Sequence, residues 1–420
     1  MHKRDFLRTL GGSALGLMMG PDLARRLEAA TPAALASDEP FWGAIRASYR
    51  LPTDFINLES GYYSMQATPV LEAFVGHVRR LNTQAARYMR TEMVPDKRRV
   101  RARVAAMAGC GPDELVITRN TTESLDTVIA GFDWKAGDEA VMASHDYGAM
   151  LDQFKLVARR HGVVNRVIDV PLHPRSDDEV VAAYAAAITP RTRMLMICHV
   201  VNLTGQVLPV RKVADMAHAR GVQVLVDGAH AFAQLDFRIP DTGADYYGAS
   251  LHKWLGVPLG AGILYVRKER IAGIWPLFGD SNFADDDIRK LNHTGTVPCH
   301  TDVTILDAID FHERIGTARK EARLRWLQSY WTSRVRELPG VTLNTPSDPA
   351  RTCAIANVAV AGMTPGQLAK RLMDEHRIFT VAIDRPEAKI AGVRVTPHLF
   401  TSTSELDALV AAVRGMAGNG

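Results

Sequence analysis

The sequence around residue 253 combines residue types that could carry covalent chemistry. In "DYYGASLHKWLGVPLGAG", Lys253 stands between a predicted strand that ends at Ser250 and a glycine-rich run. A lysine in an apolar, partly desolvated position loses its proton more readily and becomes a nucleophilic amine. Asp227 follows the nearly pure strand pattern "VQVLV". Because an unpaired carboxylate is costly at the edge of a buried sheet, we expect a cationic group to pair with Asp227.

The segment "TRNTTESLDTVIAG" predicts an anion site at the start of a helix. The backbone N–H groups of Thr121, Thr122 and Glu123, together with the threonine hydroxyls, would bind an anion such as a phosphate. Simple N-capping by Asn120 or Thr121 is the alternative interpretation.

A parallel sheet would bring these residues together. From about residue 115 to 270, short apolar runs alternate with segments of helical period, which is typical of a sheet covered by helices on both faces. Ligands bind such sheets at the carboxyl ends of the strands. We therefore predict an α/β fold with a mostly parallel seven-stranded sheet sandwiched by helices. The strands are the runs ELVIT, DEAVMAS, VNRVIDV, RMLMICHVVN, VQVLVD, DYYGAS and GILYV.

Two intervening helices carry end signals: Ser176 and Glu179 fit a capping box, and Gly221 fits a left-handed cap. After about residue 302 the pattern changes to a long helical stretch through Leu338, which predicts a smaller α+β C-terminal domain. Its strands are expected near 353–360, 378–383 and 392–396. The predicted divisions are an export signal at 1–36, an N-terminal arm at 37–69, a large domain at 70–300 and a small domain at 301–420.

The composition excludes several classes of protein. The 420 residues carry a net charge of only +4, and the densest basic run, "DKRRVRAR" at 96–103, fits a solvated helix face, so no nucleic-acid partner is expected. The four cysteines, Cys110, Cys198, Cys299 and Cys353, are far apart and form no CxxC, which argues against a zinc cage or a disulfide framework. No Gly-x-Gly-x-x-Gly follows a strand, so a dinucleotide site is not indicated.

The N-terminus predicts export. "HKRDFLRTLGGSALGLMMG" joins basic residues to an apolar run that is too short to span a bilayer, so no stable membrane insertion is expected. The stretch resembles a twin-arginine signal, with Lys3-Arg4 where two arginines are usual, and "AALA" at 33–36 fits a processing site before Ser37. This resemblance implies export of the folded protein to the periplasm. A cytoplasmic protein is the alternative.

"DGAH" at Asp227 and "SLHK" at Lys253, with the anion site upstream, resemble the fold-type I pyridoxal-phosphate (PLP) enzymes over residues 55–415. Within them, "HDYGA", "DGAH", Gly295-Thr296 and "VRVTPHLF" are similar to the isopenicillin N epimerase-like branch of the class V aminotransferases. The resemblance implies that PLP is the cofactor. Lys253 would form the aldimine with it and later move the substrate α-proton, while Asp227 would pair with the pyridine nitrogen, so that the ring accepts the electrons of an α-carbanion.

The same resemblance implies further roles. His145 would stack on the cofactor ring, although a shift of two residues would give this place to Tyr147. Arg394 would bind the substrate carboxylate bidentately. Thr296 would reach the phosphate bound by a partner subunit, which implies a homodimer. Asn202 and His230 would lie near the phenolic oxygen, and Thr121, Thr122, Ser250 and His252 would surround the phosphate.

The substrate and reaction stay open at this point. Tyr62 and Tyr63 are expected to line the entrance for a small amino-acid or peptide-derived substrate, or else to pack a domain junction. The resemblance implies an aminotransferase or epimerase reaction, and the sequence does not separate these from β-elimination. A cysteine desulfurase would need a cysteine on a loop before Arg394, and residues 378–393 contain none; Cys353 fits a buried structural thiol. Export would favour tailoring of a peptide or siderophore precursor.

Two other classes of function fit these residues less well. A metal-dependent hydrolase could use Asp227, His230 and His252 as ligands, but their spacing is loose and Lys253 would have no role. A non-enzymatic binding protein with the same fold could keep the phosphate site, but the presence of Lys253 and Arg394 argues against it.

Overall fold

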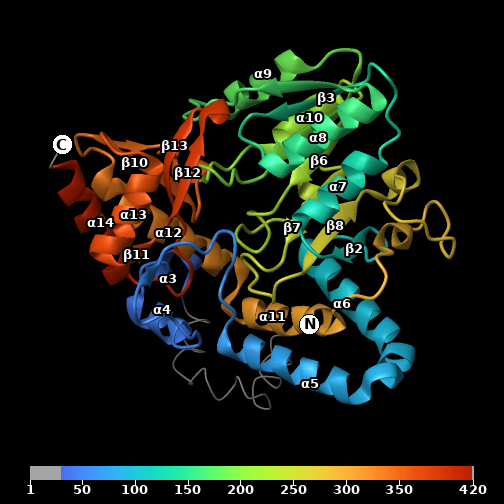
Figure 1. Ribbon diagram of the computed structural model, residues 1–420, viewed down its shortest axis with the longest axis horizontal. Helices are drawn as coiled ribbons and strands as arrows, with labels where there is room; N and C mark the ends of the chain where they lie inside the picture. Colours follow the sequence, from blue (N-terminus) through green and yellow to red (C-terminus); the bar gives the residue numbers. More distant parts are fainter. Residues whose placement is uncertain (1–29, 419–420) are drawn as a thin grey trace.

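The computed structural model describes residues 30–418, so most of the predicted export signal lies outside the described residues. Figure 1 shows a large sheet with its helices and, beside it, a smaller C-terminal sheet with helices of its own. Within residues 30–418, none of the helices is both long enough and apolar enough to cross a membrane.

All seven predicted strands form one sheet, in the order β2-β8-β7-β6-β5-β3-β4. Strand β8 runs antiparallel to both β2 and β7, and the other neighbours are parallel. The carboxyl ends of β2, β7, β6, β5 and β3 therefore lie at one edge, which confirms the predicted fold class. The strands are β2 (Leu115–Thr118), β3 (Glu139–Ala143), β4 (Val164–Ile168), β5 (Thr192–Cys198), β6 (Gln223–Asp227), β7 (Tyr246–Ser250) and β8 (Gly262–Val266).

Both faces of this sheet are buried, because alternate residues of each strand point to opposite faces. In β5, Leu195 and Ile197 belong to one core cluster, whereas Met194 and Met196 belong to the other. The cluster with Leu195 includes side chains of α6 (Met93–Ala108), α9 (Asp177–Ala187), α10 (Val210–His218) and α11 (Cys299–Ile315), and the cluster with Met194 includes those of α7 (Thr121–Gly131) and α8 (Gly148–His161). Helix α5 (Thr68–Thr91) packs along α6 and α11.

The C-terminal part is an α+β unit with its own core cluster. Its sheet has the order β12-β13-β10-β9 and is antiparallel. Two of the expected segments are each divided in two. The long helical stretch through Leu338 consists of α11 and α12 (Thr317–Val335), which Gly316, with φ +90°, separates. The strand expected near 378–383 consists of two strands. The remaining elements are β9 (Val341–Leu343), β10 (Ala356–Val360), α13 (Pro365–His376), β11 (Ile378–Phe379), β12 (Val381–Arg385), β13 (Ile390–Val395) and α14 (Thr403–Ala417).

The N-terminal arm packs mainly on the C-terminal unit. Strand β1 (Ile56–Asn57) pairs with β11, and helices α3 (Pro32–Leu35) and α4 (Glu39–Arg46) lie beside α12, as Figure 1 shows. Around the predicted processing site, Leu35 and Ala36 are buried, and the Ala36 carbonyl accepts a hydrogen bond from Arg323. The segment proposed for removal thus ends inside the folded structure.

The predicted helix ends are only partly present. Gly221 has a left-handed backbone, as expected. Ser176 does precede α9, but its side chain makes no capping hydrogen bond. The carboxylate of Glu179 instead accepts from the backbone N–H and the guanidinium of Arg175. The predicted capping box is therefore wrong, because the Glu179 carboxylate binds Arg175 instead.

Candidate active site

The carboxyl ends of the strands open into one cavity of about 300 Å³. Segments that follow β2, β3, β5, β6 and β7 all contribute to it, and so does the N-terminal arm. The five strand ends that the sequence placed together do meet. The lining residues are Tyr62, Tyr63, Arg119, Asn120, Thr121, Thr122, Tyr147, Met150, Cys198, Val200, Asn202, Asp227, Ala229, His230, Ser250, His252, Lys253, Leu259 and Gly260.

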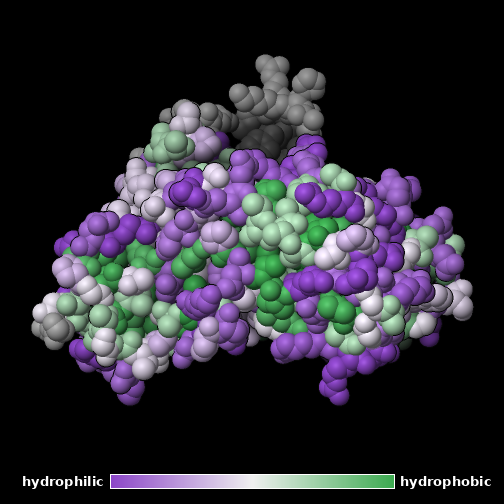
Figure 2. Space-filling model, turned by 90° about the horizontal axis from the view of Figure 1, so that it is seen from above, coloured by the Kyte–Doolittle hydropathy of each residue, from purple (hydrophilic) through white to green (hydrophobic). Residues whose placement is uncertain are grey.

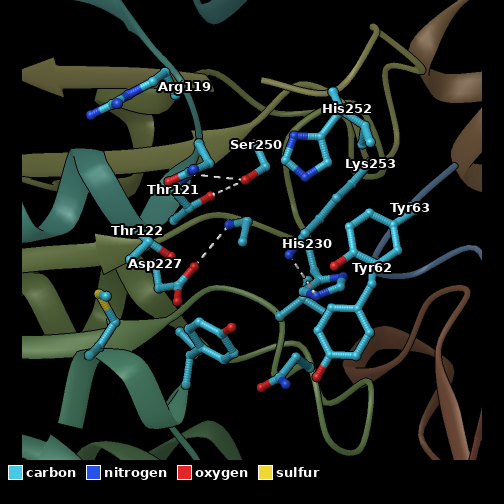
Figure 3. A pocket seen from close by; sticks show the side chains of 18 of the residues that line it. Tyr62, Tyr63, Arg119, Thr121, Thr122, Asp227, His230, Ser250, His252 and Lys253 are labelled. Carbon is cyan, nitrogen blue, oxygen red and sulfur yellow. Dashed lines mark hydrogen bonds between the residues drawn. The ribbon is translucent and has the colours of Figure 1, made fainter. Parts of the chain in front are cut away.

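Lys253 extends from the turn after β7 into this cavity (Figure 3). Its Nζ lies 3.1 Å from Nε2 of His230. Burial lowers the pKa of Lys253 to about 8, with Asp227 acting to raise it and Arg394 to lower it. Burial together with the charge of Lys253 holds the pKa of His230 well below its usual value. The cavity therefore holds a neutral imidazole beside an amine that gives up its proton near neutral pH.

Asp227 ends β6 with its side chain buried against the same cavity. Gly228 follows because a Cβ at that position would come within 2.0 Å of the Tyr247 ring. One carboxylate oxygen accepts from the backbone N–H of Ala229 at 3.0 Å. Among the described residues no ion-pair partner lies beside the carboxylate, and burial raises its pKa. The expected cationic partner is thus not a neighbouring side chain, which leaves room for a protonated ring nitrogen.

The start of α7 forms the predicted anion end of the cavity, with fewer backbone donors than expected. Thr121 donates its N–H to the Ser250 hydroxyl at 3.0 Å, and the two hydroxyls lie 2.7 Å apart. The N–H of Glu123 donates to the Asn120 side chain, which is the helix cap. The Thr122 N–H and the one hydroxyl hydrogen that the Thr121–Ser250 contact does not use therefore remain for an anion. Glu123 does not line the cavity and pairs with Arg119 at 3.0 Å.

Buried polar atoms without partners test whether PLP fits. In the described part of the chain, the Asn202 side-chain oxygen and the Nδ1 atom of His230 have no hydrogen-bond partner, although both side chains are buried at the cavity. Buried polar atoms are normally satisfied, so these atoms indicate a polar ligand. An aromatic ring with a phenolic oxygen, a ring nitrogen and a phosphate would complement Asn202, Asp227 and the start of α7, so the residues present fit PLP.

The two candidates for the stacking position are placed differently. His145 is buried outside the cavity, with Nε2 3.3 Å from the carbonyl of Ala388 in the small domain. Tyr147, which immediately precedes α8, lines the cavity. Of the two candidates, Tyr147 therefore lies at the cavity and His145 does not.

The two tyrosines of the arm both line the cavity, as expected for an entrance. Tyr63 is 68% exposed, and its ring lies roughly parallel to that of His252 at 6.5 Å. Burial lowers the pKa of His252 to about 4, so this side chain is neutral. Figure 3 shows Tyr62 and Tyr63 on the same side of the site as Lys253.

Arg394, the expected ligand of a substrate carboxylate, is fully buried on β13 and does not line the cavity. It forms a two-point ion pair with Glu59, with Nε–Oε2 and Nη2–Oε1 distances of 3.1 and 2.7 Å. Sequence analysis missed Glu59, although it lies within the segment "NLESGYY" that supplies the two tyrosines. A single acidic residue after a short apolar run was the only signal that could have found it.

Thr296 is exposed in a segment away from the cavity of its own chain. Other residues at the cavity were also not singled out, among them Arg119, Cys198 and Leu259. Cys198 could not be recognised, because nothing in its strand pattern separates it from a core residue.

Among residues 30–418, no three His, Cys, Asp or Glu side chains are grouped to hold one metal ion, so Asp227, His230 and His252 do not form the site that a metal hydrolase would need.

Comparisons with known proteins agree with this geometry. An isopenicillin N epimerase of Streptomyces clavuligerus is 27% identical over 394 residues, covering 90% of this chain and 98% of that protein. A probable cysteine desulfurase of Halobacterium salinarum is 28% identical over 395 residues, covering 86% and 91%. A structure of a C-DES mutant with glycine covalently linked to the PLP cofactor has the same fold, with a TM-score of 0.80, 22% identity and coverage of 88% and 99%. The family model for class-V aminotransferases matches residues 58–382, and the chain therefore belongs to this PLP-dependent family.

Proposed function

We propose that this protein moves a proton at the amine-bearing carbon of an amino acid or amino-acid-derived metabolite, in an epimerase or aminotransferase reaction. The observation that supports this best is the position of Lys253. Its amine, with a pKa lowered to about 8, shares one cavity with the buried and unpaired carboxylate of Asp227. Bound PLP supplies an aldehyde for amines and a ring that withdraws electrons from the attached carbon.

The residues of the chain would divide the remaining work. Lys253 would hold the cofactor and then carry the proton, since a base with a pKa near the working pH transfers protons well. Asp227 would stay charged beside a protonated ring nitrogen, and the orphaned oxygen of Asn202 would accept from a protonated phenolic group. Thr121, Thr122 and Ser250 would hold the phosphate, and Tyr147 would lie against the ring in place of His145.

β-Elimination, as in a β-lyase or a desulfurase-type enzyme, is the second candidate. It is favoured by the relatives named cysteine desulfurases, which match most of this chain. A thiol that carries sulfur needs to ionise, but burial raises the pKa of Cys198 well above its usual value and that of Cys353 to about 12. Neither of these two thiols is thus suited to carry a persulfide, which favours elimination without a protein persulfide over a desulfurase mechanism.

Incubation with D- and L-amino acids and peptide amines in deuterated water would separate the reactions. Epimerisation would place deuterium at the α-carbon and invert the configuration of that carbon. Transamination would yield keto products, and elimination would yield a fragment that has lost its β-substituent. The control is K253A. A colourless purified protein, in which borohydride attaches no cofactor to Lys253, would contradict the proposal.

We also propose that the protein is a homodimer in which Thr296 completes the phosphate site of the partner. Support comes from its exposure and from two large exposed hydrophobic side chains that precede it by 21 and 18 positions in the chain, Trp275 at 69% and Phe278 at 52%. Figure 2 shows hydrophobic residues exposed in patches on one face. T296A should weaken PLP binding without dissociating the dimer, and a monomer with unimpaired PLP affinity would contradict this arrangement.

Export to the periplasm by the twin-arginine route is likewise a proposal. Since Leu35 and Ala36 are buried in the folded protein, we expect any cut to fall before Thr31 rather than before Ser37. N-terminal sequencing of protein from fractionated cells would test both points. Recovery of the full-length chain only from the cytoplasmic fraction would contradict export.

A further inference from the structure

Arg394 is already bound to a carboxylate that belongs to the protein. Two of its nitrogens contact the two oxygens of Glu59, and Nη1 donates to the carbonyl of Asn202 at 3.1 Å. The exposed fractions of the two side chains in the pair are 0% and 5%. A bidentate arginine–carboxylate pair of this kind is the geometry in which a guanidinium would bind a substrate carboxylate. Glu59 therefore takes up the two guanidinium donors with which Arg394 was expected to bind a substrate carboxylate.

Glu59 is fixed by more than Arg394. Its Oε1 atom also accepts the backbone N–H groups of Gly61 and Tyr62, both at 3.0 Å. These bonds hold the carboxylate inside the turn that leads to the two cavity tyrosines. A substrate carboxylate that displaced it would break them, and would leave two carboxylates beside one buried arginine.

The Tyr62 ring lies close to both Arg394 and Lys253. The guanidinium carbon lies 4.0 Å from the centre of the Tyr62 ring, and Nζ of Lys253 lies 5.9 Å from the same ring. Tyr62 lines the cavity, whereas Arg394 is not among the described residues that do so. The cavity wall near the reactive amine thus includes an aromatic ring that packs against the buried Arg394–Glu59 ion pair.

We propose that the substrate carries no free carboxylate on its amine-bearing carbon, and that its carboxyl group is instead in amide linkage, as in the amino-terminal residue of a peptide. This inference rests on the proposed PLP chemistry and narrows its substrate class. It also replaces the expected role of Arg394, which on this view neutralises Glu59 and positions Tyr62.

Binding to the PLP-loaded enzyme tests this inference. L-Alanine, L-alaninamide and L-alanylglycine are titrated while the visible absorbance of the cofactor is followed, and the D-isomers are run in parallel. Because an amide lowers the pKa of the neighbouring amine, affinities are compared per neutral amine. We expect the amide and the dipeptide to bind about tenfold or more tightly than alanine, because only alanine would have to displace Glu59 or leave its carboxylate unpaired.

The variant E59Q supplies the second measurement. It keeps an oxygen for Gly61 and Tyr62 but leaves Arg394 without its counter-charge, so alanine should gain about tenfold or more in affinity relative to alaninamide. The control is E39Q, which removes the carboxylate from a second buried arginine, Arg323, remote from the cavity. It should leave the preference unchanged.

The outcomes distinguish a failure of this inference from a failure of the proposed function on which it rests. If the wild type binds alanine as tightly as the amide, or if folded E59Q shows the wild-type preference, the inference is wrong and the PLP chemistry stands. If E59Q does not fold, the wild-type comparison alone decides. If no probe changes the absorbance and borohydride traps no cofactor on Lys253, the proposed function itself is wrong.

Discussion

The neutral state of Lys253 can be measured without any substrate. Burial lowers its pKa from 10.5 to about 8. At pH 7 a pKa of about 8 leaves about 9% of the amine neutral, about 300-fold more than an ordinary lysine with a pKa of 10.5 would have. Because Asp227 acts to raise this pKa, D227N should lower it further and increase the neutral fraction. The sign follows from Coulomb attraction, which favours the protonated amine.

The assay is an NMR titration of the cofactor-free protein after reductive methylation with ¹³C-formaldehyde. K253R removes the signal of interest and so assigns it. The signal of Lys320 has to be assigned in the same way with K320R, because burial lowers the pKa of Lys320 to about 7. Lys268, whose pKa is raised by its hydrogen bond to Asp113, is the internal reference. A Lys253 signal that titrates with Lys268, or one that moves upward in D227N, would refute the reasoning.

Three further predictions follow from single contacts. D227N should lower turnover on the order of 10²-fold while the fold persists, since it removes the charge that faces the ring nitrogen; steady-state kinetics and circular dichroism check both parts. E59A should cost about 3–5 kcal/mol of unfolding free energy in urea, because it leaves Arg394 charged, buried and unpaired, and a cost near zero would contradict the ion pair. C353A should retain activity, because this thiol is buried in the core; loss of sulfide release from cysteine in this variant would instead indicate a persulfide carrier.

The strands and the residues at their ends could be predicted from the sequence. Asp227 and Ser250 were placed at the last positions of their strands, and both end β6 and β7 there. This works because a parallel sheet buried on both faces needs nearly continuous apolar runs, which polar residues then terminate. Lys253 could be placed for the same reason, since it follows β7 by three residues.

Contacts between distant segments could not be predicted in this way. Glu59 and Arg394 are separated by 335 positions in the chain, and each lies in a short strand-like segment that has no periodic signal for its partner. The different placement of His145 and Tyr147 relative to the cavity has a more local cause. Both follow β3 within four residues, and only the path of the turn before α8 decides which side chain enters the cavity.

The surroundings of Arg394 connect substrate choice to the assembly of the whole protein. Its guanidinium joins β13 of the small domain to Glu59 of the arm and to the Asn202 carbonyl of the large domain. Asn202 at the same time presents its unpartnered side-chain oxygen to the cavity. A shift of the small domain would therefore disturb both the cofactor side and the substrate side of the site. For this reason, substitutions of Arg394 should change stability, cofactor affinity and the preference for amides together, whereas a residue that only bound substrate would change the last alone.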